Sequence, residues 1–173
     1  MAVRPIVLYP DPVLLKPTRA VAQVDGDVRQ LVRDMTETLY AAPGIGLAAN
    51  QVGVSQQVCI VDLDAGERPD GLLVLVNPRI VASSGSQVGE EGCLSFPELT
   101  LEVERALEIR VEALNVEGER FALAAEGLLA RVIQHECEHL AGQVFLRNLS
   151  AIKRELIKKQ IRKRIQAGDW YVA

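Results

Sequence analysis

The sequence predicts an α+β fold in which mainly antiparallel β-sheets surround a central, buried helix. From about residue 54 to 115 the chain consists of β-branched runs separated by turn-forming residues, which is the pattern of short strands. From about 125 to 140 it carries so many apolar residues that a helix there must be largely buried. Strands that surround one such helix indicate the α+β class.

The elements before this helix can be placed in order. Four prolines predict an extended arm with turns over residues 4–22: Pro5, Pro10, Pro12 and Pro17. An N-terminal helix follows, capped by Asp25 or Asp27 and ended by Pro43 and Gly44. Its apolar residues are three and four positions apart: Val28, Leu31, Val32, Met35 and Leu39. The expected strands cover residues 57–62, 72–76, 79–82, 101–103 and 109–113, and the expected turns cover 66–71, 83–86 and 115–118.

A second capped helix ends the chain. Gly142 is well placed to stop the buried helix, and Ser150 to begin a C-terminal helix over residues 150–166, before Gly168. We expect this helix to be amphipathic, with an apolar stripe that docks on the rest of the protein: Ile152, Leu156, Ile157, Ile161 and Ile165. With 173 residues, no internal repeat and no low-complexity linker, the chain 1–173 is predicted to form a single domain.

The charge is unevenly distributed. The net charge of −4 argues against a nucleic-acid-binding protein. Residues 150–166, however, hold seven basic residues and one acidic residue, so this helix carries +6 and the remainder of the chain −10. The simplest interpretation is a solvated face; the functional alternative is attraction to an anionic partner.

The cysteine count and the N-terminal sequence bear on location. Three cysteines form an odd number without the spacing of a disulfide framework. The N-terminus lacks an apolar stretch followed by a cleavage site, and no apolar run approaches the ~20 residues of a membrane-spanning helix. We therefore expect a cytoplasmic protein that does not act at a membrane.

The strongest chemical motif is His135-Glu136-Cys137-Glu138-His139, which fits H-E-x-x-H inside the buried helix. Residues four apart share one helix face, so His135 and His139 can bind one metal while Glu136 carries protons beside it. The simpler alternative is a pair of hydrogen-bonded core histidines with two surface acids.

A catalytic site of this type needs a third protein ligand. Cys93 offers one in the segment Glu91-Gly-Cys-Leu-Ser95, since a thiolate suits a borderline-soft divalent metal. The alternative for Cys93 is a small buried apolar residue, which describes Cys59 far better. Cys137 should lie on the opposite helix face from the histidines.

A third motif is Gly44-Ile-Gly-Leu-Ala-Ala-Asn-Gln51. Its glycines allow the backbone to approach a ligand closely, and the Gln51 amide could stabilise a developing oxyanion. Taken alone, the stretch is most often a glycine turn, and it lacks the pattern of a phosphate-binding loop.

Together, the three motifs resemble the signature motifs of peptide deformylase, in the same order and at similar spacing. The resemblance covers nearly the whole chain and agrees with the α+β fold. It implies a catalytic domain that removes the N-formyl group from the initiator methionine of nascent polypeptides, releasing formate. It also implies one divalent metal per chain, Fe(II) in the native state with zinc or nickel as substitutes.

The resemblance assigns residues by position. Cys93, His135 and His139 would bind the metal, and a metal-bound hydroxide would attack the formyl carbon. Glu136 would act as general base and then general acid. The oxyanion would be held by the metal, the Gln51 side chain and the Leu94 backbone N–H.

A methionine pocket is expected beside the metal. Leu128 and Val132 precede His135 by seven and three residues and share its helix face. With Ile45 they should line an apolar recess, although Leu128 could equally be plain core. Arg131 could reach the pocket rim. The full set expected to bind substrate is Ile45, Gly46, Glu91, Leu128 and Val132.

The chain departs from the family pattern at three positions, of which Asn50 falls at a variable place in its motif and is expected to change little. Glu138 replaces an Asp of many members, and we expect it to pair with Arg105. Thr100 replaces an Arg that helps to hold the substrate backbone, so peptide preference can differ.

The resemblance also suggests an anionic partner for helix 150–166, because bacterial deformylases use a similar C-terminal helix to sit on the ribosome. Binding to a membrane surface is the rival, although the helix lacks the aromatic residues that such helices often bury. Two other functions stay open: a zinc endopeptidase, disfavoured by the Cys93 ligand, and a binding module without activity, disfavoured by the complete set of ligands.

Overall fold

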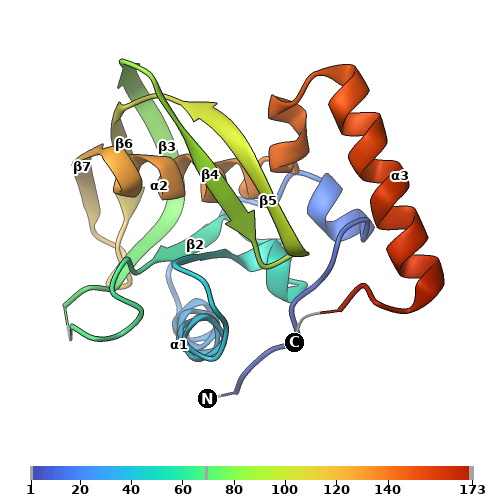
Figure 1. Cartoon of the computed structure of the whole chain (residues 1–173). Coiled ribbons are helices and arrows are strands. Elements are labelled where there is room, and N and C mark those ends of the chain that lie inside the picture. Colours follow the sequence, from blue (N-terminus) through green and yellow to red (C-terminus); the bar gives the residue numbers. More distant parts are fainter. Residues whose placement is uncertain (1, 69, 172–173) are drawn as a thin grey trace.

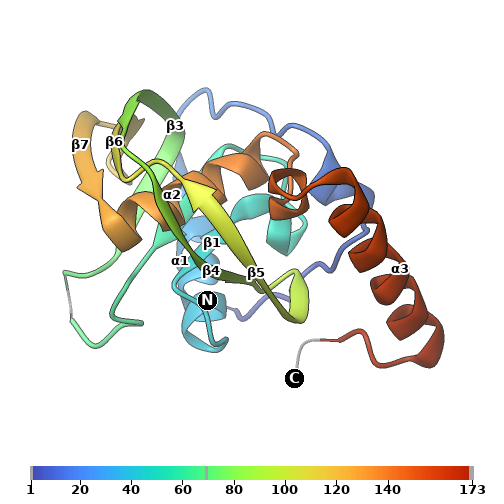
Figure 2. The ribbon, with the colours of Figure 1, turned by 45° about the horizontal axis from the view of Figure 1, so that its top comes forward.

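The structure is a computed structural model that describes residues 2–68 and 70–171. Within this part of the chain, five strands form one antiparallel sheet in the order β1-β2-β3-β6-β7, and β4 pairs with β5 in a separate antiparallel ribbon. Helix α2 lies between the sheet and the ribbon, so the predicted α+β architecture around a central helix is confirmed (Figures 1 and 2).

The strands are β1 (Gly46–Ala48), β2 (Val58–Val61), β3 (Leu73–Ser84), β4 (Gln87–Cys93), β5 (Phe96–Arg105), β6 (Glu108–Leu114) and β7 (Arg120–Glu126). The helices are α1 (Gly26–Tyr40), α2 (Gly127–Leu140) and α3 (Ala151–Ala167). Three short 3-10 helices complete the set: η1 (Pro12–Leu15), η2 (Ala49–Val52) and η3 (Phe145–Asn148).

Helix ends follow the capping residues of the sequence. The Asp25 carboxylate accepts hydrogen bonds from the backbone N–H groups of Asp27 and Val28, which selects Asp25 over Asp27 as the cap of α1. Ser150 caps α3 in the same way, and Gly168 ends α3 in the left-handed conformation. The predicted bounds of α1 and α3 are therefore confirmed to within a few residues.

Several strand predictions were wrong. Residues 72–76 and 79–82 belong to the single strand β3, whose register shifts between Val76 and Arg79 because Asn77 adopts a φ of 51° before Pro78. Strands β4 and β7 were not predicted, and β5 is much longer than the predicted 101–103. Because β7 takes the residues up to Glu126, α2 begins at Gly127 rather than near 125.

Helix α2 is anchored in the core on the side away from the ribbon. Ala130 and Ile133 are completely buried in a cluster that includes Cys59 of β2, Leu75 of β3 and Val111 of β6. These contacts fix the position of the helix that carries the H-E-x-x-H motif. Within the described residues, no helix is long and apolar enough to cross a lipid bilayer.

Helix α3 docks through a narrower face than the sequence suggested. Among its described residues Ile161 alone is buried, against Leu14, Phe96 and Phe145, and Ile157 is partly buried. Ile152, Leu156 and Ile165 of the expected stripe are exposed instead. The predicted apolar stripe is thus wrong for these three residues. At about 100° per residue, Ile152 and Leu156 lie about 180° and 140° around the helix from Ile161, whereas Ile165 lies on the same side but in the last turn of α3.

This difference predicts unequal effects of two similar substitutions in α3. Ile161→Ala should lower the free energy of unfolding by about 2–4 kcal/mol, since it opens a cavity in a packed cluster. Leu156→Ala, at a side chain that is 62% exposed, should change it by less than about 0.5 kcal/mol. Urea unfolding of both variants measures the two values, and similar losses would contradict this docking of α3.

Candidate active site

The three predicted metal ligands converge. Cys93 ends strand β4, while His135 and His139 lie one turn apart on α2. Their potential ligand atoms all lie within 4.8 Å of one another, and Cys93 Sγ is 3.2 Å from His139 Nε2. A thiolate with two imidazoles is a donor set that suits a divalent transition metal, so the residues fit the implied ion.

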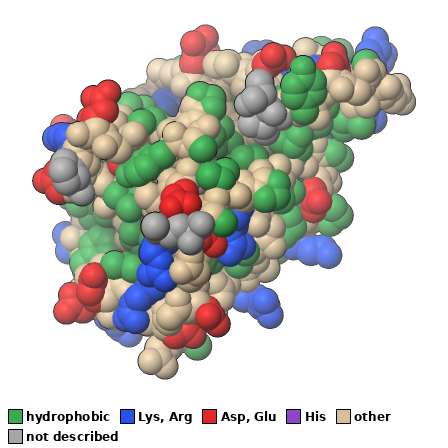
Figure 3. Space-filling view, turned by 90° about the horizontal axis from the view of Figure 1, so that it is seen from below, with side chains coloured by type: hydrophobic (Ala, Val, Ile, Leu, Met, Phe, Trp, Pro, Cys, Tyr) green, Lys and Arg blue, Asp and Glu red, His purple; other side chains and the backbone are tan. Residues whose placement is uncertain are grey.

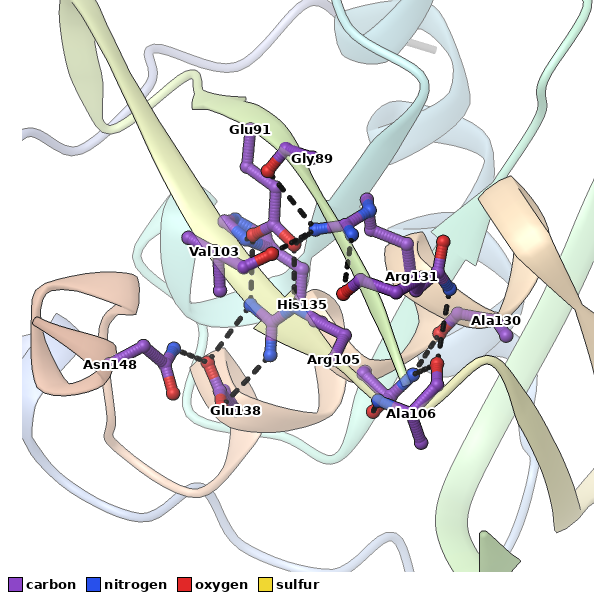
Figure 4. A network of polar contacts seen from close by, with 12 residues as sticks. Gly89, Glu91, Val103, Arg105, Ala106, Ala130, Arg131, His135, Glu138 and Asn148 are labelled. Atoms are coloured by element: carbon purple, nitrogen blue, oxygen red, sulfur yellow. Dashed lines mark hydrogen bonds and ion pairs between the residues drawn. The ribbon is translucent and has the colours of Figure 1, made fainter. Parts of the chain in front are cut away.

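Glu91 orients the His135 ring through its Nδ1 atom. One of its carboxylate oxygens lies 2.9 Å from His135 Nδ1, which leaves Nε2 of the ring for a metal. The same carboxylate accepts hydrogen bonds from the guanidinium groups of Arg105 and Arg131 (Figure 4). Burial alone would raise the pKa of Glu91, but hydrogen bonds from Arg105 and His135 outweigh it and hold this pKa at about 2.

These contacts change the interpretation of two residues. Glu91 was expected among the substrate-binding residues, yet both of its oxygens are engaged by side chains of the protein. Arg131 lines the cavity, as expected, but it is only 6% exposed, and its guanidinium donates to the carbonyl oxygens of Gln87 and Val103. Both residues instead join β4 and β5 to α2.

The expected contact between Glu138 and Arg105 is confirmed, with 3.0 Å between Arg105 Nη1 and Glu138 Oε1. Asn148 donates a hydrogen bond to the same carboxylate at 3.3 Å. Figure 4 shows Arg105 between Glu91 and Glu138, so one guanidinium connects the strand that supplies Cys93 with the helix that supplies the histidines.

Glu136 adjoins His135 in a contrasting environment. It is 3% exposed, and its Oε2 is buried without a hydrogen-bond partner among the described residues. Burial raises the pKa of Glu136 to about 7. A carboxyl group with such a pKa can both accept and donate a proton near neutral pH.

Gly46 of β1 is required by this carboxyl group. A Cβ atom at this position would lie 2.5 Å from Glu136 Oε1 and 2.7 Å from Val132 Cγ1. The glycine does permit a close approach, as the sequence suggested, but the group that approaches is the protein's own acid.

Gln51 is fixed beside Cys93. Its Oε1 accepts a hydrogen bond from the Ala48 backbone at 2.9 Å, and its Nε2 donates to Ser95 Oγ at 3.2 Å and lies 3.6 Å from Cys93 Sγ. Two further buried residues support this arrangement: Ser95 was not singled out from the sequence, and the expectation that Asn50 changes little was wrong. Ser95 orients Gln51, and Asn50 donates to the His139 carbonyl oxygen at 2.6 Å. The only sequence signal for a role of Ser95 and Asn50 is that they lie within the motifs 91–95 and 44–51.

A cavity of about 920 Å³ opens over these groups. The residues expected at the site that line it are Ile45, Gly46, Gln51, Glu91, Cys93, Leu94, Leu128, Val132, His135 and Glu136. Val132 is 7% exposed, whereas Leu128 is 53% exposed and thus belongs to the cavity edge rather than to the core. Thr100 lies at the cavity as well.

Three protein ligands leave a coordination position open, as catalytic rather than structural sites do. With a buried acid adjoining one of the ligands, the fold and site define a metal-dependent hydrolase of the H-E-x-x-H class. Comparison with known proteins specifies the class further. The chain belongs to the polypeptide deformylase family, whose model matches residues 3–155.

Curated relatives span essentially the same length. A peptide deformylase of Acidobacterium capsulatum is 47% identical over 170 residues, which cover 98% of this chain and all of the relative. Peptide deformylase 1 of Burkholderia multivorans is 51% identical over 164 residues, covering 94% of this chain and 90% of that protein.

Solved structures agree with the fold. The crystal structure of a peptide deformylase from Legionella pneumophila matches with a TM-score of 0.87 and 40% identity, covering 96% of this chain and 98% of the other. The Ehrlichia chaffeensis peptide deformylase in complex with actinonin matches with a TM-score of 0.88 and 38% identity, covering 95% and 98%.

The role of Glu91 can be tested through metal binding. Glu91→Gln removes the charge opposite His135 and leaves Arg105 without part of its buried counter-charge, so we expect about a 10- to 100-fold loss of metal affinity. Competition with a chromophoric chelator measures that affinity. Glu102→Gln, at an exposed position of β5, is the matched control. Equal affinities of the two variants would show that Glu91 does not hold the ligand in place.

Proposed function

We propose that this protein hydrolyses the N-formyl group from the N-terminal formylmethionine of nascent polypeptides in the cytoplasm, releasing formate. The observation that carries the proposal is the Cys93, His135 and His139 group beside the buried Glu136, in a chain that belongs to the deformylase family. The three free cysteines, none of them paired in a disulfide, are consistent with a reducing compartment.

Cys93, His135 and His139 would hold one divalent metal, with Fe(II) as the native ion and zinc or nickel as substitutes. When bound, the metal polarises the formyl carbonyl and lowers the pKa of water. The protein contributes the fixed orientation of its ligands, since Glu91 holds the His135 ring and Gln51 lies against Cys93.

Glu136 is proposed to move the protons. Its carboxylate takes a proton from the attacking water and later delivers it to the nitrogen of the leaving amine, which becomes the free N-terminus of the peptide. The pKa of about 7 suits both steps. The Gln51 Nε2–H and the Leu94 backbone N–H would donate to the formyl oxygen as negative charge develops on it.

The substrate is proposed to enter the cavity with its methionine side chain against Ile45, Leu128 and Val132. These apolar side chains line the cavity and offer no charged group, and two of them belong to α2. Gly46 leaves room for Glu136 beside the scissile bond. We assign Glu91 to the positioning of His135 and not to direct substrate contact.

We further propose that α3 contacts the ribosome, whose RNA supplies phosphates. Four cationic side chains of the helix are exposed: Lys153, Lys159, Arg162 and Lys163. Ile152 and Leu156 are exposed among them, so an anionic surface with apolar contacts would match this face.

The central test is the activity of metal-loaded protein purified without oxygen. The wild type should release formate from formyl-Met-Ala-Ser, and Glu136→Ala should reduce kcat by a factor of about 10² to 10⁴ with its metal retained. Glu104→Ala, at an exposed position of β5, is the control. Glu138→Ala is unsuitable, because Glu138 pairs with Arg105. An inactive wild type with full metal occupancy would overturn the assignment.

Ribosome binding can be tested by charge reversal, which leaves the docked face of α3 intact. The double variant Lys159→Glu, Lys163→Glu should pellet with ribosomes at least severalfold less than the wild type, and added salt should abolish the difference. A double variant with the same change of net charge, Arg110→Glu with Arg120→Glu on the exposed side of β6 and β7, serves as control. Equal pelleting of both variants would refute a specific contact through α3, and binding to anionic vesicles instead would favour a membrane surface.

A further inference from the structure

The chain turns back toward the cavity after α3. Gly168 has a φ of 77°, a left-handed conformation that glycine adopts at little cost and that reverses the direction of the backbone. Residues 169–171 then run from the end of α3 toward the β4–β5 turn (Figures 1 and 2). We refer to residues 169–171 as the C-terminal tail.

Trp170 fixes this tail to the protein. Its indole Nε1–H donates a hydrogen bond to the Tyr9 carbonyl oxygen at 2.7 Å. Its ring meets Phe96 edge to face, with 6.4 Å between the ring centroids, and Phe96 stacks in turn on Tyr9. Aromatic pairs of this kind stabilise beyond their buried area. The tail is therefore attached to a defined position.

Arg164 of α3 strengthens the attachment. Its guanidinium donates to the Pro97 carbonyl oxygen at 3.0 Å and to Glu98 at 2.7 Å, and also to the backbone oxygen of Asp169 at 2.9 Å. The same group lies 5.1 Å from the centroid of the Trp170 ring, within reach of a cation–π contact. One side chain thus connects the start of β5 with the tail.

The end of α3 and the C-terminal tail form an additional wall of the cavity. Arg164, Asp169 and Tyr171 line it together with Glu98, Leu99 and Thr100, which lie beyond Cys93 and Leu94 along the chain. The Tyr171 residue is 61% exposed, so much of its ring is free to contact another molecule. Seen from below, hydrophobic side chains are spread over much of the face, with acidic and basic side chains both among them and at the edges (Figure 3).

The size of the cavity indicates that it receives more than one residue. A volume of about 920 Å³ is near the upper end of the pockets that bind whole drug-sized ligands, and a formylmethionyl group alone would leave much of it empty. An extended peptide advances about 3.3 Å per residue and alternates the direction of its side chains. The residues after methionine must therefore pass the cavity walls on their way to solvent.

We propose that the C-terminal tail forms a subsite for apolar or aromatic side chains of the residues that follow formylmethionine. The proposal rests on the proposed function, since it uses the same cavity and substrate class. Tyr171 supplies the contact surface, whereas Trp170 and Arg164 hold it in position. The protein would thus discriminate among nascent chains by the residues after methionine.

Kinetics with two substrates tests the subsite. The ratio of kcat/KM for formyl-Met-Phe-Phe to that for formyl-Met-Ala-Ala should fall about 3- to 10-fold in Tyr171→Ala, through KM rather than kcat, because Tyr171 lines the cavity without belonging to the group of proposed metal ligands. Tyr171→Phe should retain most of the ratio. Leu156→Ala, exposed on α3 and absent from the cavity lining, should leave it unchanged. An unchanged ratio in Tyr171→Ala, or an equal loss on both substrates, would overturn the proposal.

A binding measurement separates this proposal from the proposed function. Trp170 is the only tryptophan of the chain, so its fluorescence reports on the tail directly. Titration with the deformylated peptide Met-Phe-Phe should change this fluorescence to saturation, and Tyr171→Ala should weaken the binding about 3- to 10-fold. If the wild type hydrolyses neither formyl peptide, the proposed function fails and the titration still decides on the subsite. A fluorescence unaffected by Met-Phe-Phe would refute it.

Discussion

The arrangement of the site depends on one buried carboxylate, that of Glu91. It lies on β4, accepts from Arg105 of β5, and meets both Arg131 and His135 of α2. Through this carboxylate both strands of the ribbon are connected to α2. Removing one member of such a buried ionic network costs about 3–5 kcal/mol, because the remaining charges lose their partners. The distance between Cys93 and the histidines is set by this connection.

Two buried acids within the same site therefore take opposite roles. Glu91 is surrounded by donors, and its pKa of about 2 keeps it a permanent acceptor. Glu136 is buried against the backbone of Gly46 with one oxygen lacking a hydrogen-bond partner among the described residues, and its pKa of about 7 allows it to change protonation state. Residue type alone does not distinguish them, since both are glutamates within two residues of a proposed metal ligand, Glu91 two positions before Cys93 and Glu136 directly after His135. The difference arises from the partners that the fold supplies.

The two glutamates also show which features of the site could be predicted from the sequence and which could not. The closeness of His135 and His139 could be predicted, because a separation of four residues on a helix places two side chains on one face whatever the surroundings. The partners of Glu91 could not, because they depend on how β4 and β5 cross α2. Strand β4 itself was missed: its residues 87–93 include two glycines and two glutamates and lack the β-branched run that signals a strand. Strand β7 was missed for a similar reason, since Ala occupies three of its seven positions.

Helix α3 is a second case in which tertiary contacts decide what the sequence leaves open. Its apolar residues are distributed around much of the helix, so the sequence could not indicate which of them would dock. Phe96 and Phe145 select Ile161, and that choice turns Arg164 toward the cavity and Ile152 toward solvent. One packing contact thus divides the basic residues of α3 into two groups with different surroundings. Arg164 pairs with Glu98 and holds the C-terminal tail, whereas Lys159 and Lys163 are exposed and have no ion-pair partner among the described residues. The net charge of +6 therefore overstates what α3 can offer to a partner, and the end of the helix belongs to the substrate cavity instead.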